Sequence, residues 1–365
     1  MLKPISISKI NKILFFFILI SIILFFGKEF FVLIAFAGFL AMLMTPVSNR
    51  LEKHHLPRTL TSLISVFIIV ALIAVVIGLL SAQISNVIEE IPQIKKGLQE
   101  MISNLQSLIS NKFGVSLEEQ MNTVKEKASG AVSSAGGFLT GFIKEIFTFF
   151  GSFLLVLVFT FLFLLHREKY ESFVVMLYKP EKRKEAKEVI SKISKVAQKY
   201  LGGRLISIVF LGILYLIGFT IIGLKNAALL AAITAVTTFI PYIGPFLGGL
   251  VPILMSIISG SFDQALWVVI IITIAQLVDN YFVEPIFVGG SVSISPFFTI
   301  FILILGGAIW GIAGVILFLP LLGIVKIVFE NIEGLQPYAY LIGDQKESSG
   351  SKEIWSMIKG LFSRK

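Results

Sequence analysis

The sequence predicts an all-α polytopic membrane protein with about eight transmembrane segments, broken or re-entrant helices in its C-terminal half, and an amphipathic helical insert. Three observations support this prediction. Hydrophobic residues make up 56% of the 365 residues and charged residues 15%, whereas about one quarter of a soluble globular chain is charged. The apolar residues gather in runs near or above the roughly 20 residues that cross a bilayer. The basic residues, which give a net charge of +9, cluster beside these runs.

Several function classes are disfavoured by what the sequence lacks. Nucleic acid is not needed to explain the basic residues, because the positive-inside bias and anionic lipid explain them better. The chain has no cysteine, which excludes disulfides, thiolate metal sites and a cysteine nucleophile. It has no P-loop, His-Glu-x-x-His or Gly-x-Ser-x-Gly motif. The adjacent His54 and His55 lack a third ligand at helical spacing and are expected in a solvated loop. We expect no enzyme, catalytic residue, cofactor or metal site.

Residues 1–82 are predicted to form an N-terminal transmembrane hairpin and a third span. Two apolar runs, 13–26 and 30–44, are separated only by Gly27, Lys28 and Glu29. The two charges are costly in the acyl region, so a tight hairpin is expected, with both side chains at the water interface. The first run has a basic flank but no small-residue cleavage site, which is typical of an uncleaved span. The third span is expected at about 59–80.

Residues 83–137 are predicted to form the amphipathic insert. Apolar residues recur there at steps of three and four, as on one face of a helix. Ser116 and Glu119 have the spacing of a capping box that opens a second helix. Five lysines against six glutamates favour the extracytoplasmic side. The insert is either a helical hairpin that packs on the membrane domain or an arm for partner binding or gating.

Residues 138–329 are predicted to form the transport core, followed by a cytoplasmic tail at 330–365. The segment 166–204 carries eleven basic residues against five glutamates, which places it in the cytoplasm. Its second half is amphipathic and is expected to lie at an anionic membrane surface or against the helix bundle. Both termini are predicted to be cytoplasmic. This holds whether the segments 227–259 and 297–329 cross the membrane or both turn back.

The apolar run 227–258 contains three prolines and three glycines between Phe239 and Pro252. Each proline lacks an N–H and clashes with the carbonyl one turn earlier, so the helix must break. Such a break survives in a membrane only where it is buried in protein or lines a cavity. Pro241 and Pro245 are expected to free the carbonyls of Thr237 and Pro241, and Tyr242 adds a hydroxyl. Broken helices of this kind carry the substrate and ion sites of secondary transporters.

Asp279 is the strongest single candidate for a functional side chain. It follows a long apolar run and is itself followed by apolar residues, and an ionisable residue at membrane depth is a functional hypothesis by default. It could load and release a proton, or join Asn280, Gln276 or free carbonyls around a cation or a polar solute. Gln276 lies one turn earlier and so on the same helix face. The alternative is a satisfied cap at the interface. Glu284 is expected nearer a loop and in water.

The order of these motifs resembles the signature of the autoinducer-2 exporter family of bacterial permeases. The residues that carry the resemblance are Phe239 to Phe246, Gln276, Asp279, Asn280, Pro285, Gly289, Ser295, Pro296, Gly306, Gly307, Gly311, Gly314 and Pro320. The resemblance implies a multi-pass transporter of the bacterial cytoplasmic membrane that forms homo-oligomers. Some members are assigned export of the signalling furanone autoinducer-2, and others sodium/proton antiport. The family's pair of an acidic residue and asparagine falls on Asp279 and Asn280.

Three functions remain open at this point. The first is a secondary transporter (permease) of the autoinducer-2 exporter type, which moves a small polar metabolite or signal. The second is a sodium/proton or other cation/proton antiporter, and the third is a non-transporting scaffold or regulator. The expected partners are a polar solute, a coupling cation or proton, and anionic lipid at 166–204. The candidate solute- or ion-binding residues are Pro241, Tyr242, Gly244, Pro245, Gln276, Asp279, Asn280 and Pro285.

Overall fold

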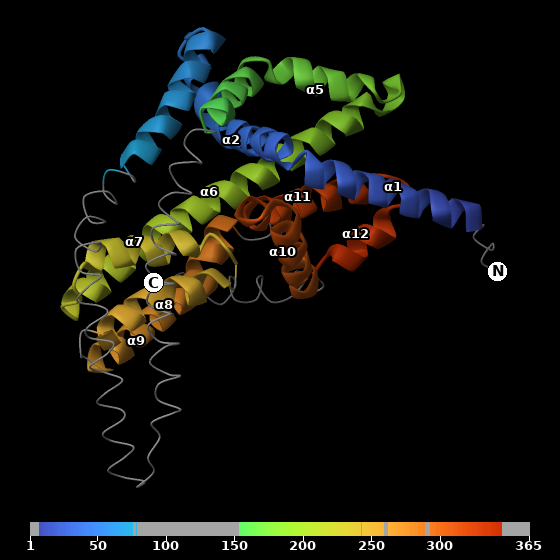
Figure 1. Cartoon of the computed structure of the whole chain (residues 1–365). Coiled ribbons are helices and arrows are strands. Elements are labelled where there is room, and N and C mark those ends of the chain that lie inside the picture. Colours follow the sequence, from blue (N-terminus) through green and yellow to red (C-terminus); the bar gives the residue numbers. More distant parts are fainter. Residues whose placement is uncertain are drawn as a thin grey trace, which may run out of the picture. The chain divides into compact units, whose positions relative to one another are not determined.

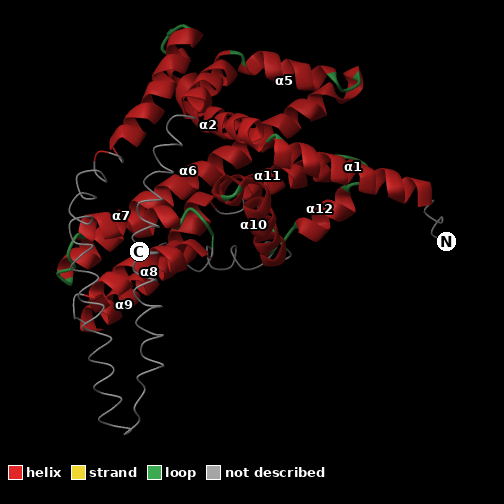
Figure 2. Cartoon of the chain, in the orientation of Figure 1, coloured by secondary structure: helices red, strands yellow, loops and turns green. Residues whose placement is uncertain are grey.

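The computed structural model describes residues 7–75, 78, 153–241, 243–258, 262–288 and 293–344. Every regular element in these ranges is a helix (Figure 2), apart from one isolated antiparallel bridge between Ile294 and Gly343. The prediction of an all-α protein is therefore confirmed. The predicted insert 83–137, residues 138–152, Tyr242, and most of the tail lie outside the described residues.

Five helices in the described part of the chain are long and apolar enough to cross a membrane. They are α2 (Lys28–Glu52), the helix Arg58–Val75, α6 with the short turn before it (Pro180–Ile221), α9 with its continuation (Phe262–Val288) and α11 (Ile312–Glu330). Four shorter apolar helices accompany them: Phe153–Leu165, α7 (Ala227–Thr237), α8 (Ile243–Ile258) and α10 (Pro296–Trp310). This set of helices is that of a multi-pass membrane protein.

The chain forms two compact units. The first contains residues 1–66, 153–203 and 288–365, and the second contains 67–152 and 204–287. Each unit is assembled from stretches that are far apart in the sequence. The predicted division into consecutive domains stays a prediction.

In the first unit, the two N-terminal apolar runs form helices that meet end to end. α1 covers Ile7–Phe26 and α2 follows after Gly27 alone. Gly27 stays in helical hydrogen bonds on both sides, since its N–H donates to Ile23 (2.8 Å) and its carbonyl accepts from Phe31 (3.0 Å). Figure 1 shows α1 extending away from the end of α2 rather than folding back along it. The predicted tight hairpin is therefore wrong.

The charges at this junction have local partners that make a full turn unnecessary. The ammonium of Lys28 lies 5.8 Å from the centre of the Phe25 ring, and Glu29 lies in the first turn of α2, where the helix dipole favours an acid. The carbonyl of Leu24, just before the junction, accepts a hydrogen bond from Trp310 Nε1 at 3.0 Å. These contacts serve the side chains and the backbone without a turn in the chain.

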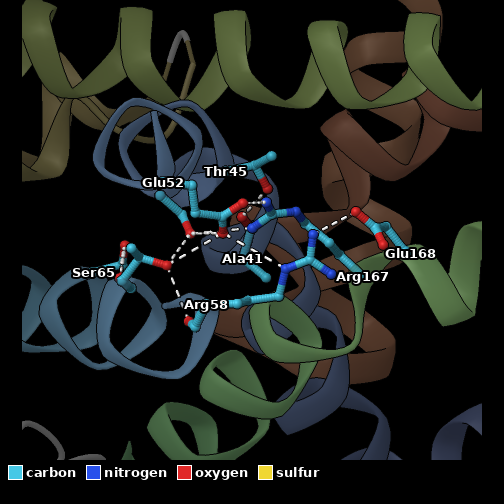
Figure 3. A network of polar contacts seen from close by, with 9 residues as sticks. Ala41, Thr45, Glu52, Arg58, Ser65, Arg167 and Glu168 are labelled. Carbon is cyan, nitrogen blue, oxygen red and sulfur yellow. Dashed lines mark hydrogen bonds and ion pairs between the residues drawn. The ribbon is translucent and has the colours of Figure 1, made fainter. Parts of the chain in front are cut away.

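A cluster of ionic and hydroxyl side chains joins the C-terminal end of α2 to two neighbouring helices (Figure 3). The Arg167 guanidinium donates to Glu52 Oε2 at 2.5 Å and to Ser48 Oγ at 3.1 Å. Arg58 pairs with Glu52 at 3.7 Å and also with Glu168. The hydrogen bond from Arg58 holds the pKa of the Glu168 carboxyl below its ordinary value. We call Glu52, Arg58, Arg167 and Glu168 the charge cluster.

The predicted basic segment consists of α5 (Arg167–Met176), the turn η1 (Pro180–Lys182) and the first half of α6 (Arg183–Ile221). α6 has 39 residues and runs without interruption from the basic segment into the mostly apolar residues 205–221. Ala197 and Tyr200 on its apolar stripe are buried, and Gly202 faces Leu43 of α2. Of the two expected locations for this stripe, the structure shows packing against helices.

The predicted segment 297–329 consists of a pair of helices, α10 and α11, that turns back at Gly311. Gly311 has φ +60° and ψ −140°, a conformation that favours glycine. Gly306 and Gly314 then face each other so closely that a Cβ on Gly306 would lie 2.6 Å from the Gly314 carbonyl oxygen. These glycines therefore serve helix packing. After α11, the short α12 (Gln336–Ile342) ends at the bridge to Ile294.

The second unit packs the C-terminal half of α6 with α7, α8 and α9 (Phe262–Val278). Tyr215 and Phe219 of α6 are fully buried and their rings stack at 5.8 Å. Lipid is as apolar as leucine, so close packing holds such helices together. The remaining core consists of Leu211, Leu224, Leu230, Ala231, Ala235, Val268, Ile272 and Ala275.

Candidate functional site

The break predicted around Tyr242 is present. α7 ends at Thr237 and α8 begins at Ile243. Between them the chain winds more tightly, with N–H groups that donate to carbonyls three residues earlier at Thr238, Phe239 and Ile240. The predicted free carbonyls are not free: Thr237 O accepts from Ile240 N (3.0 Å) and Pro241 O from Ile243 N (2.7 Å). Pro241 and Pro245 lack the N–H groups that would bond to these two carbonyls one turn later. The N–H groups of Ile240 and Ile243, which are closer in sequence, bond to them instead.

Across this break the chain folds back on itself. The Thr234 hydroxyl oxygen of α7 lies 3.1 Å from the Gly248 carbonyl oxygen of α8, and a Cβ on Gly244 would overlap the carbonyl of Thr237. α7 has 11 residues and α8 has 16, which correspond to lengths of about 16 and 24 Å. Neither helix reaches the roughly 30 Å of a hydrocarbon core. The apolar run 227–258 therefore forms a helical hairpin.

Three threonines of this hairpin donate hydroxyl hydrogen bonds to backbone carbonyls three or four residues earlier in the chain. Thr234 Oγ1 donates to Leu230 O (2.7 Å), Thr237 Oγ1 to Thr234 O (2.8 Å) and Thr238 Oγ1 to Ala235 O (2.5 Å). Thr234 and Thr238 are buried. These bonds give polar atoms near the break a partner inside the hairpin.

A series of polar pairs runs along the contact between α6 and α9. Gln276 Nε2 donates to the Tyr215 hydroxyl at 2.8 Å, and the Ser207 hydroxyl donates to Asp279 Oδ1 at 2.5 Å. Further along, Arg204 and Glu284 form an ion pair at 3.3 Å. Asp279 is only 2% exposed, although it lies within a candidate membrane span. We call these three contacts the polar seam.

The chain changes its helical form at Asp279. From Asp279 to Val288 it is a π-helix, η2, which continues α9 and contains Pro285. π-helices are rare and occur often at functional sites. Asp279 and Val288 are buried, whereas Ile286 is 60% exposed.

The hairpin tip and Asp279 lie at the same end of the second unit. A Cβ on Gly249 of α8 would lie 3.1 Å from Ile272 of α9, and one on Gly212 of α6 would lie 3.5 Å from Ala235 of α7. Consecutive helices here run antiparallel. Counting from the Gly249–Ile272 contact, α8 leads back to Pro241 over about as many residues as α9 leads on to Asp279. Counting from the Gly212–Ala235 contact, α7 leads on to Pro241 over about as many residues as α6 leads back to Ser207.

The candidate residues divide into three groups. Asp279 and Gln276 both contact α6, which agrees with the predicted shared face. Pro241 and Gly244 are buried and Pro245 is half-buried at the hairpin tip, while Tyr242 lies outside the described residues. Asn280 and Pro285 are exposed on the outer side of η2.

Sequence reasoning misplaced Glu284 and missed its partners. Glu284 was expected in water but is half-buried and paired with Arg204, because the π-helix turns it toward α6. The sequence does contain a signal for α6, since Arg204, Ser207 and Tyr215 follow the spacing of one helix face through an otherwise apolar run.

Comparisons with known proteins give one consistent result. A family model described as AI-2E family transporter matches residues 14–334. YueF of Bacillus subtilis, named as a candidate transport protein, is 28% identical over 221 residues, which cover 60% of this chain and 58% of YueF. A Borreliella burgdorferi protein named in the same way is 30% identical over 227 residues, covering 61% and 62%.

A third relative has a name that includes a cargo. TqsA of Escherichia coli, named as an AI-2 transport protein, is 33% identical over 106 residues, which cover 29% of this chain and 31% of TqsA. The matched stretches of all three relatives thus span less than two thirds of each relative's length.

Proposed function

The chain belongs to the AI-2E transporter family, and from this membership we propose that it is a secondary transporter that moves a small polar metabolite or signal across the cytoplasmic membrane. The solute or ion would bind at the end of the second unit where the hairpin tip and Asp279 lie. TqsA, a relative over part of its length, is named for AI-2 transport, which supports a small polar signal such as autoinducer-2 as the cargo.

The observation that carries this proposal is the buried Asp279–Ser207 pair at the same end as the broken segment. A carboxylate that is 2% exposed in a candidate span is expensive and calls for a function. A break in a helix nearby gives irregular backbone, which membranes tolerate where it is buried or lines a cavity. Secondary transporters place their substrate and ion sites at such breaks.

Replacing Asp279 by asparagine tests this assignment. We expect Asp279→Asn to lower solute uptake into proteoliposomes by about tenfold or more, because an amide cannot carry the carboxylate's charge or exchange its proton. Autoinducer-2 and a panel of polar metabolites would be the solutes. The matched control is Asp263→Asn, which makes the same change at an exposed carboxylate in the first turn of α9. Wild-type uptake by folded Asp279→Asn protein would contradict the proposal.

Cation/proton antiport is the second candidate, because the same buried carboxylate could exchange a proton for a cation. Proteoliposomes loaded with a pH-sensitive dye separate the two. Proton movement that is driven by a sodium gradient, with no polar solute present, supports antiport. A scaffold role would be indicated if Asp279→Asn and Gly244→Leu left every phenotype unchanged while deletion of 83–137 abolished it.

The surroundings of the protein are proposed on charge grounds. The segment 166–204, with eleven basic residues against five glutamates, supports a cytoplasmic location for that segment and contact with anionic lipid. Both termini would then lie in the cytoplasm of a bacterium. Homo-oligomer formation is proposed from the family alone.

A further inference from the structure

We propose that Arg204 is a positioning residue, whose ion pair with Glu284 holds η2 in the π-helical register that keeps Asp279 against Ser207. The inference rests on the proposed function in one respect, namely that Asp279 is the carboxylate that binds the solute or ion. Arg204 would act through the backbone of η2 rather than by touching the cargo.

The spacing of the four residues is the first argument. In a π-helix, residues five apart are neighbours, because each N–H bonds to the carbonyl five residues earlier. Asp279 and Glu284 are five apart, and they contact Ser207 and Arg204, which lie one turn apart on α6. In an α-helix, at about 100° per residue, the two acids would lie about 140° apart around the axis. Only the π register lets both of them face α6.

Burial along η2 gives the same result. An α-helix would place Ile286, seven residues after Asp279, on the buried face. Ile286 is instead 60% exposed, and Val283 and Val288 are buried with Asp279. The π-helical register is therefore kept along η2, and it determines which side chains face α6.

The backbone alone holds this register weakly. Pro285 lies inside η2 and has no N–H to donate, so the helix lacks one of its bonds directly after Glu284. Side-chain contacts must then contribute more to keeping the segment in place. The Arg204–Glu284 pair is the contact next to the proline.

The burial of the Arg204 side chain explains why breaking the ion pair would be costly. The Arg204 side chain is 8% exposed and that of Glu284 is 37% exposed. A largely buried guanidinium that loses its carboxylate keeps its desolvation penalty without compensation. α7 and α8 contain no titratable side chain. In the described part of the second unit, the titratable groups at this end are therefore Arg204, Tyr215, Asp279, Tyr281 and Glu284, and Tyr281 is exposed.

The test uses the full chain in lipid and two measurements, one of which needs no cargo. Amide hydrogen exchange of residues 279–288 reports how often η2 opens. Uptake into proteoliposomes reports function. The variants are Arg204→Gln, Glu284→Gln, Arg204→Lys and the charge-exchanged double variant Arg204→Glu with Glu284→Arg.

We expect exchange in η2 to be about tenfold faster in Arg204→Gln and Glu284→Gln, with uptake reduced in both. Arg204→Lys and the charge-exchanged variant should return both measurements to within about threefold of wild type, because the ion pair is restored. The matched control is Lys182→Gln with Glu333→Gln, which breaks an ion pair whose side chains are 55% and 91% exposed. That double variant should show the same rate of amide hydrogen exchange in η2 as the wild type.

Unchanged exchange in folded Arg204→Gln protein overturns the positioning role, whatever uptake does. Faster exchange that is not reversed by charge exchange overturns it as well. If exchange responds as expected while Asp279→Asn transports normally, the positioning role stands and the proposed binding role of Asp279 fails. The two claims therefore fail separately.

Discussion

At the scale of single residues, the α7–α8 hairpin depends on glycines that have no room for a methyl group. A Cβ on Gly244 would overlap the Thr237 carbonyl, and one on Gly248 would overlap the Thr237 hydroxyl. Gly249 is different, because its nearest neighbour is the end of the Ile272 side chain at 3.1 Å, which can move. The same residue type thus has two structural roles within one turn of α8.

Gly244→Ala should therefore destabilise the protein, whereas Gly249→Ala should change its stability little. Forcing a Cβ into the Thr237 backbone requires the two helices to separate, which typically costs about 1–3 kcal/mol. The measurement is the thermal midpoint of the purified variants in detergent, with the same scan rate for both. Equal midpoints for the two variants would show that the close approach is not tight.

Residue-scale prediction from the sequence succeeded where the cause was local. The break at Pro241 and Pro245 was predictable because a missing N–H acts on its own helix. The shared helix face of Asp279 and Gln276 followed from helix periodicity. The partners on α6 were missed because they depend on how two helices distant in sequence are aligned. Glu284 was misplaced because α-helical periodicity was assumed across a π-helix.

At the scale of elements, the charge cluster joins three helices through side chains rather than through a continuous chain. Glu52 closes α2, Arg58 opens the next helix, and Arg167 opens α5. The side chains of Glu52 and Arg167 are 23% and 20% exposed, so water screens their attraction only partly.

A double-mutant cycle with Glu52→Gln and Arg167→Gln should reveal this coupling. Each single variant leaves the other charge partly buried without its main partner. The double variant should therefore be more stable than the sum of the two losses predicts, by about 0.5–3 kcal/mol. Thermal midpoints of the four proteins supply the data. Arg183→Gln, at the exposed first residue of α6, is the control. Strict additivity would mean that the two side chains act independently.

Element boundaries were predicted better than the directions of the elements. The positions of most spans follow from apolar runs, and the described helices begin and end close to them. Whether a helix turns back at a junction was not predictable from composition. Gly27 was expected to turn the chain and instead continues it, whereas Gly311 does turn it, with φ +60°. The difference lies in the tertiary contacts at each junction, such as that of Trp310 with Leu24.

At the scale of the whole molecule, the sequence predicted an all-helical membrane protein, and the structure and the family agree. Sidedness is a further prediction that rests on charge. The wild-type chain has no cysteine, so a single introduced cysteine is the only thiol that a maleimide can label.

A membrane-impermeant maleimide should label Lys112→Cys in intact cells but should label Lys184→Cys only after the membrane is opened. Lys112 lies in the near-neutral predicted insert, outside the described residues, and Lys184 lies in the strongly basic segment. Labelling is read as a mass shift on a gel. Efficient labelling of Lys184→Cys in intact cells would reverse the proposed orientation.

The threonines of the α7–α8 hairpin have a consequence for the chemistry that a cargo would meet. Each hydroxyl has one proton, and those of Thr234, Thr237 and Thr238 already point at carbonyls of their own helix. Thr234 and Thr238 are buried, so the half-buried Thr237 is the one of the three that can still present oxygen lone pairs outward. A molecule with an O–H or N–H group, or a partly dehydrated cation, would find an acceptor there, whereas a carboxylate or phosphate would find no donor among the three.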